Sequence, residues 1–453
     1  MRVKQLKMQS FRGIGDLTLD FDEKEPTVLV GINGVGKSSI LDCLAILLSH
    51  MIREILYFSE SNSSRKGTYK TIRKSDYSFL GNNNESKKAI PGEPELENRF
   101  FNEQDITNGS EKTNNQIEIL LESKIFEIGL SKNKEINDKE NHHENTDLNF
   151  FKDIKYRWKK NPESNIPLAV YYSVNRAFVN VDLEIIDISS FKQIDAYDQA
   201  FNGIKIGFHR FFQWFRSVED LESEMLRDNR DYRDKQLEAV KRAISSLIPE
   251  FSNLRVRRSP TLRMTLQKNG EELIINQLSD GEKCLLAMVG DLARRLAIAN
   301  PGLEDPLQGY GVVLIDEIEL HLHPKWQREI IPALTRTFPN CQFIVTTHSP
   351  QVISEVKPEG IYVLKKTDNG VIAVRPESSY GRDSNQILED IMGVTKRPKE
   401  FQDSLHQLFQ LIEEGNLDAA RQLSQQIADI MGESEPELVK ARVSIKRKEI
   451  LKR

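Results

Sequence analysis

Short apolar runs separated by polar segments follow one another along the chain, and the spacing of their apolar residues predicts the type of each element. Residues 3–8 and 17–21 alternate between apolar and polar positions, which predicts an antiparallel pair of strands. Residues 27–30 form a continuous apolar run, as expected of a buried strand, and residues 39–48 form a longer one that predicts a buried helix. The chain is therefore expected to begin with two strands that lead into a strand, a glycine-rich loop and a helix.

The stretch from residue 51 to residue 167 differs, because it is rich in Asn, Ser, Lys and Glu. Its apolar runs at 117–121 and 125–130 predict two strands, and the remainder predicts long polar loops. His142 and His143 lie in a charged run, where a lone pair of histidines in a solvated loop indicates no metal site. This stretch is expected to be an insertion of strands and loops.

Core-forming patterns return at residues 167–176, which predict a buried strand. Residues 196–250 predict mainly helix, with an aromatic stripe at helical spacing that belongs to the core rather than to a base-stacking platform: Phe208, Phe211, Phe212 and Phe215. Strands are predicted again at 254–258, 261–266 and 272–275.

The last 75 or so residues show apolar residues at helical spacing in two segments, 401–412 and 420–430. Gly415 and Asn416 separate the two segments, so the pattern predicts a helical hairpin. A basic end follows the hairpin. The apolar stripe is either a docking or oligomerisation surface or the small core of the hairpin itself.

Composition limits the class of protein. The chain has 453 residues, 38% of them hydrophobic, and a net charge of −5, so the molecule as a whole does not attract nucleic acid electrostatically. Its three cysteines lie in or beside apolar runs, which fits a reducing cytoplasm better than a disulfide framework. No signal-peptide core begins the chain, and no apolar run approaches the roughly 20 residues of a membrane span. A cytoplasmic protein without a membrane domain is expected.

Residues 31–38 carry the chemistry of a phosphate-binding loop, because they fit the pattern G-x-x-x-x-G-K-[ST] between a predicted strand and a predicted helix. Gly31, Gly34 and Gly36 let backbone N–H groups turn onto phosphate oxygens, and the helix N-terminus adds partial positive charge. Lys37 would reach the outer phosphates, and the hydroxyl of Ser38 would hold Mg²⁺.

Three later segments complete this chemistry. In residues 278–283, Ser279 and Gly281 precede a long apolar helix and direct a hydroxyl and a backbone N–H at an anion. Asp316 and Glu317 follow a buried strand, where the first would hold Mg²⁺ and the second would polarise the attacking water as general base. His348 follows another buried strand and either donates to the γ-phosphate or caps the structure locally.

Other polar residues leave alternatives open. Arg12 follows the first strand and would either approach a nucleotide phosphate or remain a surface charge. His321 and His323 come shortly after the acidic pair and shape a subunit contact or, less readily, a metal site.

These motifs, in this order and at roughly this spacing, resemble the head of ABC-type ATPases. The details resemble its AAA-family, RecF/SMC-like and overcoming-lysogenization-defect (OLD) branch, in Phe11-Arg12-Gly13, residues 316–324 and residues 346–350. The resemblance implies an α/β fold, an ABC-type P-loop NTPase head with a mixed central sheet and helices on both faces, a long mixed insertion and a C-terminal helical segment. The implied parts are the N-terminal half of the head, the insertion, the C-terminal half of the head and a helical interaction region, at residues 1–50, 51–253, 254–375 and 376–453.

The same resemblance implies that the chain binds and hydrolyses ATP with Mg²⁺. Glu317 and His348 would be catalytic, and Ser38 and Asp316 would bind Mg²⁺. In this fold residues 278–283 complete the site of a second subunit, so a homodimer or higher homo-oligomer around ATP is implied. The residues implied to bind the nucleotide are Gly31, Ile32, Asn33, Gly34, Val35, Gly36, Lys37, Ser38, Ser39, Ser279, Gly281 and Glu282.

The sequence departs from the ABC-type pattern in one respect, since no convincing Gln-loop glutamine follows the phosphate-binding loop. Asp76 or Gln104 would have to fill that place, which puts the coupling of Mg²⁺ to lobe motion in question.

The tail from residue 378 to residue 398 is similar to the PtuA family, the ATPase subunits of the Septu antiphage system, and to their retron-linked relatives. This likeness implies an antiviral role and a separate, PtuB-like HNH nuclease as partner, with DNA reached directly or through that partner. An OLD-type nuclease would carry a metal-binding toprim domain near the C-terminus, and none is visible.

Two other functions remain as alternatives. One is a RecF-like ATPase of DNA repair or recombination that binds DNA through the basic tail and through the strand with Arg255, Arg257 and Arg258, unless that strand face is simply solvated. The other is a transporter ATPase, which the long insertion disfavours.

Overall fold

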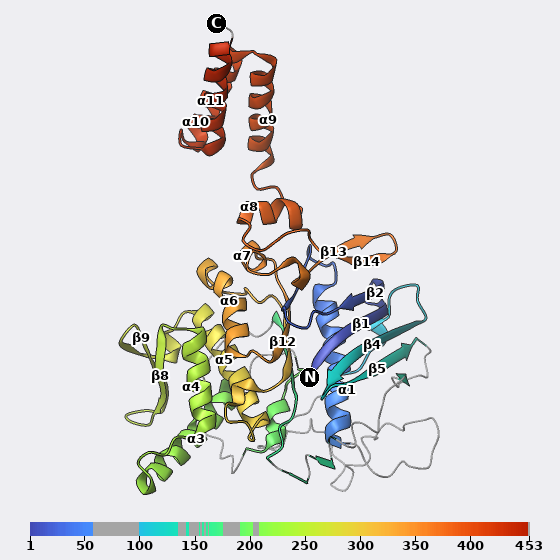
Figure 1. Cartoon of the computed structure of the whole chain (residues 1–453), viewed down its shortest axis with the longest axis vertical. Helices are drawn as coiled ribbons and strands as arrows, with labels where there is room; N and C mark the ends of the chain where they lie inside the picture. The colour runs from blue at the N-terminus through green and yellow to red at the C-terminus, as the bar shows by residue number, and fades with distance from the viewer. Residues whose placement is uncertain are drawn as a thin grey trace, which may run out of the picture. The chain divides into compact units, whose positions relative to one another are not determined.

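The computed structural model describes residues 1–57, 99–134, 142–144, 154, 156–157, 160–161, 163–174, 191–202 and 208–451 (Figure 1). The chain divides into two compact units, Met1–Arg382 (unit 1) and Asp383–Arg453 (unit 2). The implied start of the C-terminal region at residue 376 therefore lies a few residues before the start of unit 2. Asp76 falls outside the described residues.

A six-stranded mixed sheet forms the centre of unit 1 and confirms the α/β fold class. Five of its strands run parallel and one edge strand is antiparallel, joined to its neighbour by a hairpin in which Thr367 lies opposite Gly370. Side chains of the inner strands are buried, which accounts for their continuous apolar sequences. In spatial order the strands are β14 (Gly370–Val374), β13 (Ile361–Thr367), β3 (Thr27–Val30), β12 (Cys341–Thr346), β11 (Gly311–Ile315) and β7 (Leu168–Tyr172).

A second sheet is antiparallel and contains the predicted N-terminal strand pair. Helix α1 (Lys37–Tyr57) contacts strands of both sheets and so lies between them. The strands, in spatial order, are β2 (Ile14–Asp20), β1 (Arg2–Phe11), β4 (Lys112–Leu121), β5 (Lys124–Asn133) and β6 (His142–Glu144).

Two features of this arrangement differ from the expectation. Strands β4 and β5 were predicted, and β4 pairs with β1 while β5 pairs with β4; β7 joins the central sheet, so each sheet combines strands from before and after residue 51. His142 and His143 were expected in a solvated loop and instead form part of β6, where His143 pairs with Leu130. Among the described residues no group of three or more His, Cys, Asp or Glu side chains is arranged to hold a metal ion.

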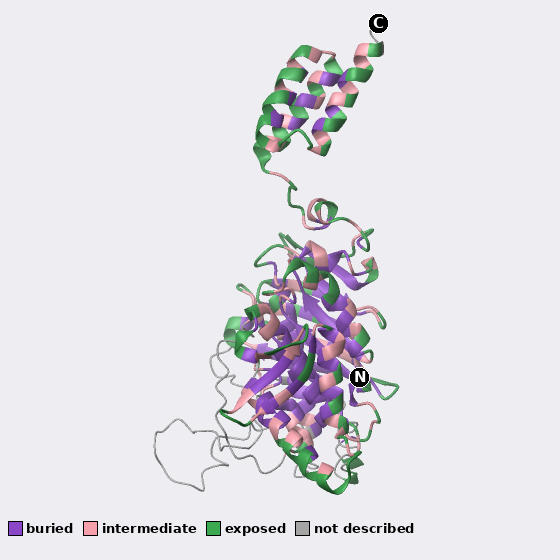
Figure 2. Ribbon diagram, turned by 90° about the vertical axis from the view of Figure 1, so that its left-hand side faces the viewer, coloured by how far each residue is buried: buried purple, intermediate pink, exposed green. Residues whose placement is uncertain are grey.

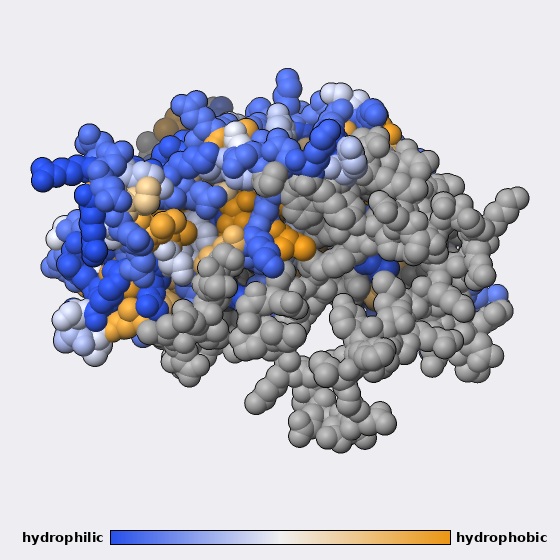
Figure 3. All heavy atoms as spheres, turned by 90° about the horizontal axis from the view of Figure 1, so that it is seen from below, coloured by the Kyte–Doolittle hydropathy of each residue, from blue (hydrophilic) through white to orange (hydrophobic). Residues whose placement is uncertain are grey.

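Two helices and a three-stranded antiparallel sheet form another part of unit 1. The helices α3 (Phe208–Asp228) and α4 (Lys235–Leu247) contact each other and strand β8. The predicted aromatic stripe is buried in the core, as the sequence indicated: Phe208, Phe211, Phe212 and Phe215. The strands, all predicted, are β8 (Phe251–Arg257), β9 (Arg263–Lys268) and β10 (Glu271–Ile274). Seen from below, the described side chains are mainly hydrophilic and show apolar groups only in separate patches (Figure 3).

Helix α5 (Asp280–Ala299) runs through the core, and its residues from Cys284 onward are buried (Figure 2). It contacts α3, α4 and β7, so it links the helical part of unit 1 to the central sheet. Helices α6 (Pro324–Thr337) and α7 (Pro350–Ile353) follow strands β11 and β12. Within the described part of the chain, no helix combines the length and apolarity that a membrane crossing requires.

Unit 2 contains three longer helices, α9 (Lys399–Glu414), α10 (Leu417–Met431) and α11 (Pro436–Leu451). The first two form the predicted hairpin, with Gly415 in the left-handed conformation between them. The third was expected to be only a basic end. Its apolar residues do not form a single stripe, because the buried set (Leu438, Ala441 and Ile445) alternates with exposed Val439 and Val443.

The apolar stripes of α9 and α10 pack with the buried face of α11 in one cluster that includes Leu405, Leu408 and Ile427. The sequence left open whether the apolar stripe is a docking surface or a small core. In the structure it forms the core of unit 2.

Candidate nucleotide site

The phosphate-binding loop joins β3 to α1, as the sequence predicts. Gly31, Gly34 and Gly36 have φ values of 156°, 76° and 111°, which residues with a side chain rarely adopt. A Cβ atom on Gly36 would also lie 3.1 Å from the side chain of Ile14. The loop therefore requires glycine both for its backbone conformation and for the space beside it.

The other loop residues are distributed between surface and core. Ile32, Asn33 and Ser38 are exposed, Val35 is buried and Ser39 is half-buried. The exposed side chains surround the N-terminus of α1, where free backbone N–H groups and the helix dipole favour an anion.

Lys37 lies across the loop, and its Nζ donates hydrogen bonds to the carbonyl oxygens of Gly31 at 2.9 Å and Ile32 at 3.1 Å. Burial lowers the pKa of this ammonium group, and the carboxylates of Asp316, Glu317 and Glu319 act in the opposite direction. Strand β12 pairs in parallel with both β3 and β11, so the loop after β3 and the acidic pair after β11 emerge at the same edge of the sheet, as a phosphate- and Mg²⁺-binding site requires.

The acidic pair is positioned by the parallel register of β11 and β12. Ile315 lies opposite Val345, so the residues that follow, Asp316 and Thr346, emerge side by side. The hydroxyl of Thr346 donates to Asp316 Oδ1 at 2.5 Å and accepts the backbone N–H of Glu317 at 2.7 Å. One threonine therefore orients both acidic residues.

Strain and burial accompany this geometry. Asp316 is buried, and its backbone N–H donates to the carbonyl of Tyr172 in the neighbouring strand β7. Glu317 has a φ of 46°, a left-handed conformation that costs about 1 kcal/mol or more outside glycine. Strained backbone of this kind gathers at functional sites, where the surrounding structure holds it in place.

Glu319 and Thr347 were not predicted as site residues, although both lie in the segments that carry the family resemblance. Glu319 accepts the hydroxyl of Thr347 at 2.7 Å and the backbone N–H of His348 at 2.5 Å. This carboxylate therefore fixes the loop that presents His348. Ser349, rather than His348, caps helix α7 by accepting the backbone N–H groups of two following residues.

The segment of residues 278–283 forms the N-terminus of α5. Ser279 is the N-cap of this helix and forms a capping box with Glu282. A Cβ atom on Gly281 would lie 2.3 Å from the carbonyl oxygen of His321, so glycine is required for this close approach. A cavity of about 170 Å³ opens beside them, lined also by His323 and Trp326.

The predicted site residues thus fall into two groups. Lys37 follows the carboxyl end of β3, and Asp316 and Glu317 follow the carboxyl end of β11, at the same edge of the parallel sheet. Ser279 and Gly281 lie instead against the segment that follows the acidic pair.

Arg12 is exposed, in agreement with the surface charge that was one of its two predicted roles, and it pairs with two carboxylates. Its Nε donates to Asp105 at 2.7 Å and its NH1 donates to Asp42 at 2.5 Å, and Arg99 also donates to Asp42. The guanidinium group joins the second sheet to α1. Gln104 precedes Asp105 and is exposed.

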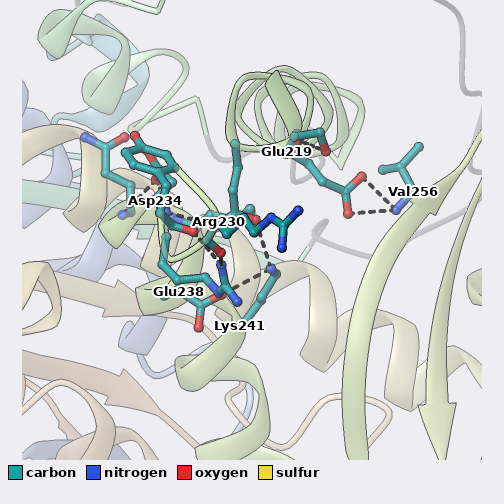
Figure 4. Close-up of polar contacts among 12 residues, drawn as sticks. Glu219, Arg230, Asp234, Glu238, Lys241 and Val256 are labelled. Carbon is teal, nitrogen blue, oxygen red and sulfur yellow. Dashed lines mark hydrogen bonds and ion pairs between the residues drawn. The ribbon is translucent and has the colours of Figure 1, made fainter. Parts of the chain in front are cut away.

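The arginines of strand β8 are neutralised by neighbouring carboxylates. Arg255 and Arg257 pair with Glu272, and Arg258 pairs with Glu219 and Asp220. In addition, the Glu219 carboxylate points at the backbone N–H of Val256 (Figure 4). Burial raises the pKa of Glu219, against the opposing effects of Val256 and Arg258. These pairs leave little net charge with which the strand would attract a phosphate backbone.

The family model described as "AAA domain, putative AbiEii toxin, Type IV TA system" matches residues 27–354, which include the loop, the acidic pair and the His348 strand. The chain belongs to this AAA family. The match covers more than half of the chain and confirms the predicted AAA membership.

Known relatives agree with this assignment. The Retron Ec83 probable ATPase of Escherichia coli is 30% identical, over 99% of this chain and 87% of its own length. The Septu protein PtuA of Bacillus thuringiensis is 24% identical, over 89% of each chain. The predicted likeness to PtuA and its retron-linked relatives is thus confirmed.

Among solved structures, an SMC head bound to the C-winged helix domain of ScpA aligns with a TM-score of 0.43 and 17% identity, covering 83% of this chain and 97% of that one. The family match and the similarity to a retron probable ATPase support an ATPase of the AAA type.

Proposed function

We propose that this chain hydrolyses Mg²⁺-ATP as an ABC-type ATPase whose copies pair around the nucleotide, and that this cycle regulates a separate HNH nuclease in antiviral defence. The observation that carries the proposal is the split of the site into two groups. Lys37 lies near Asp316 and Glu317, whereas exposed Ser279 begins a buried helix and directs an anion-binding terminus to solvent.

The residues at the loop fit a nucleotide with its metal ion. Backbone N–H groups at the start of α1 and the Lys37 ammonium would bind the phosphates, and the hydroxyl of Ser38 with the carboxylate of Asp316 offers the oxygen ligands that Mg²⁺ prefers. Bound Mg²⁺ would neutralise charge that develops on the phosphates. Glu317, oriented by Thr346, would take up the proton of the attacking water, and His348 would donate to the γ-phosphate.

Pairing of two copies follows from the second group. The hydroxyl of Ser279 and the backbone N–H of Gly281 would donate hydrogen bonds to the phosphates bound at the loop of another copy, so each active site would need residues of both copies. We also propose the division of the head that the sequence predicts, with one half at residues 1–50 and the other at residues 254–375, separated by the insertion.

The defence role and the nuclease partner rest on the relatives, which include a Septu protein and retron ATPases. The ion pairs of Arg255, Arg257 and Arg258 give no support to the alternative in which this strand binds DNA directly.

The replacement Glu317→Gln tests the mechanism. It keeps the shape of the side chain but removes the base, so we expect ATP hydrolysis to fall at least a hundredfold, within the range that general-base catalysis contributes. ATP-bound dimers should accumulate, as seen by size-exclusion chromatography with light scattering. Glu329→Gln, an exposed glutamate on α6, is the matched control and should hydrolyse ATP at the parental rate.

Hydrolysis by Glu317→Gln at the parental rate would overturn the assigned mechanism. Copurification of the parental chain with an HNH protein encoded next to it would support the proposed partner. Salt-sensitive duplex binding by the isolated chain would instead favour the repair alternative.

A further inference from the structure

Glu282 lies at the point where the proposed site would receive a phosphate. Its Oε2 accepts the backbone N–H of Ser279 at 3.0 Å and the hydroxyl of Ser279 at 2.8 Å. The hydroxyl of Ser279 therefore already donates to a negatively charged oxygen of Glu282. The proposed function assigns this same hydroxyl to a phosphate bound by a second copy.

This arrangement poses an electrostatic problem. A helix N-terminus stabilises an anion, but two anions at one terminus repel each other strongly where water is partly excluded. A capping box forms equally well with glutamine, which carries no charge. The presence of glutamate at this position therefore calls for a nearby cation.

Lys268 supplies that cation from another element. It is the last residue of β9, and its Nζ lies 2.6 Å from Glu282 Oε1. The following residues Asn269 and Gly270 have φ values of 51° and 89°, as in the two-residue turns that join antiparallel strands. This tight turn fixes the end of β9 against the start of α5.

The two charged side chains are neither fully exposed nor fully buried, with 29% of Lys268 and 19% of Glu282 accessible. Ser279 itself is exposed. The pair is thus sheltered enough for the charges to interact strongly, while Ser279 stays accessible to a second molecule. Although burial alone would raise it, the pKa of Glu282 is lowered overall by hydrogen bonds from Lys268 and Ser279.

We propose that Lys268 is the positioning and charge-compensating residue of the Ser279 segment: it neutralises Glu282 so that the Ser279 hydroxyl can donate to a phosphate of ATP bound to a second copy of this chain. The inference rests on the proposed function. Lys268 acts through Glu282 and does not itself contact the nucleotide.

The replacement Lys268→Met removes the cation and keeps most of the side chain's length. The uncompensated carboxylate should then oppose the incoming phosphate, so ATP-dependent pairing should need roughly tenfold more protein, at the lower end of the cost of breaking a partly buried charge pair. The affinity of a single chain for ATP should stay unchanged, because the loop at residues 31–38 is intact. A general folding defect would weaken both the ATP-dependent pairing and the affinity of the single chain for ATP.

Rescue distinguishes charge compensation from a structural role. Glu282→Gln preserves the capping box without the charge, so the double variant Lys268→Met with Glu282→Gln should recover parental pairing and hydrolysis. Lys241→Met is the matched control, because Lys241 has 30% accessibility and pairs with Glu222 and Glu238 on the α3–α4 helices. It should leave both measurements unchanged.

The outcomes separate the two proposals. An unmodified chain that neither hydrolyses ATP nor pairs in its presence contradicts the proposed function. An active parental chain together with a fully active Lys268→Met variant overturns the role of Lys268. An inactive double variant also overturns it, because Lys268 would then act for a reason other than the charge of Glu282.

Discussion

Asp291 is the negative charge at the centre of a buried cluster on α5, and its replacement tests how that helix is held to the central sheet. Its carboxylate accepts hydrogen bonds from Arg295 Nε at 2.6 Å, Arg294 NH2 at 2.9 Å and the Tyr172 hydroxyl at 2.9 Å. All of these side chains are buried. Tyr172 also accepts the backbone N–H of Asp316, so the cluster connects α5 to the strand beside the acidic pair.

The replacement Asp291→Asn keeps the size of the side chain but removes its charge. Two buried guanidinium groups would then face an amide, one half of which donates rather than accepts hydrogen bonds. Removing one partner from a buried ion pair typically lowers the free energy of unfolding by about 3–5 kcal/mol. That is a large fraction of the roughly 5–15 kcal/mol that stabilises a folded domain.

The pKa of Asp291 gives an independent and lower value for the contribution of its charge to the free energy of unfolding. Burial by itself would raise this pKa, but Arg295 and Arg294 lower it from 3.8 to about 2. A difference of this size between folded and unfolded chains corresponds to about 2 kcal/mol. Because the pKa is lowered on folding, this stabilisation is present above pH 4 and is lost as the pH falls from about 4 to about 2.

Urea unfolding followed by tryptophan fluorescence measures the effect in unit 1 alone, because all three tryptophans precede residue 383. Asp280→Asn is the matched control on the same helix. That side chain is 82% exposed and pairs with Lys283 at 3.4 Å, so the change should cost about 0–1 kcal/mol.

A loss of less than about 1 kcal/mol on Asp291→Asn would refute the argument that the buried carboxylate is needed to compensate the two arginines. The parental protein should also lose stability between pH 4 and pH 2 more steeply than the variant. If the free energy of unfolding changed with pH equally in both proteins, the pKa of Asp291 would not be lowered by Arg294 and Arg295.

Two further replacements test the acidic pair and unit 2. Thr346→Val should lower kcat for ATP hydrolysis roughly a hundredfold, because Asp316 and Glu317 lose the hydroxyl that orients both. Thr346→Ser keeps the hydroxyl and should hydrolyse ATP at close to the parental rate in a steady-state assay. Equal kcat values for the two variants would contradict this role of Thr346. Leu408→Ala should lower the free energy of unfolding of unit 2 by about 2–5 kcal/mol, because Leu408 is fully buried. The loss should be seen as faster amide hydrogen exchange throughout α9, α10 and α11. Ile430→Ala, at a side chain that is 72% exposed, should leave exchange unchanged, and similar exchange in both variants would refute the packing of unit 2.

Elements with a single strong pattern could be predicted from the sequence. The buried strands around residues 27–30 and 341–346 have continuous apolar sequences, and the aromatic stripe of α3 has helical spacing. Helix α11 escaped prediction because its apolar residues lie on more than one face, and only contact with α9 and α10 selects which of them form the core. Pairing of β4 with β1 joins residues more than a hundred positions apart, which local patterns do not specify.

The sequence by itself determined the conformation of the glycine-rich loop at the candidate nucleotide site, because this loop depends on glycine conformations and a helix N-terminus within one short segment. The tertiary structure alone decided how that chemistry is oriented. Thr346 reaches Asp316 through the register of two parallel strands, and Lys268 at the end of strand β9 reaches Glu282 on helix α5. Such contacts join residues that are distant in the chain, so they exist only once the elements have packed together.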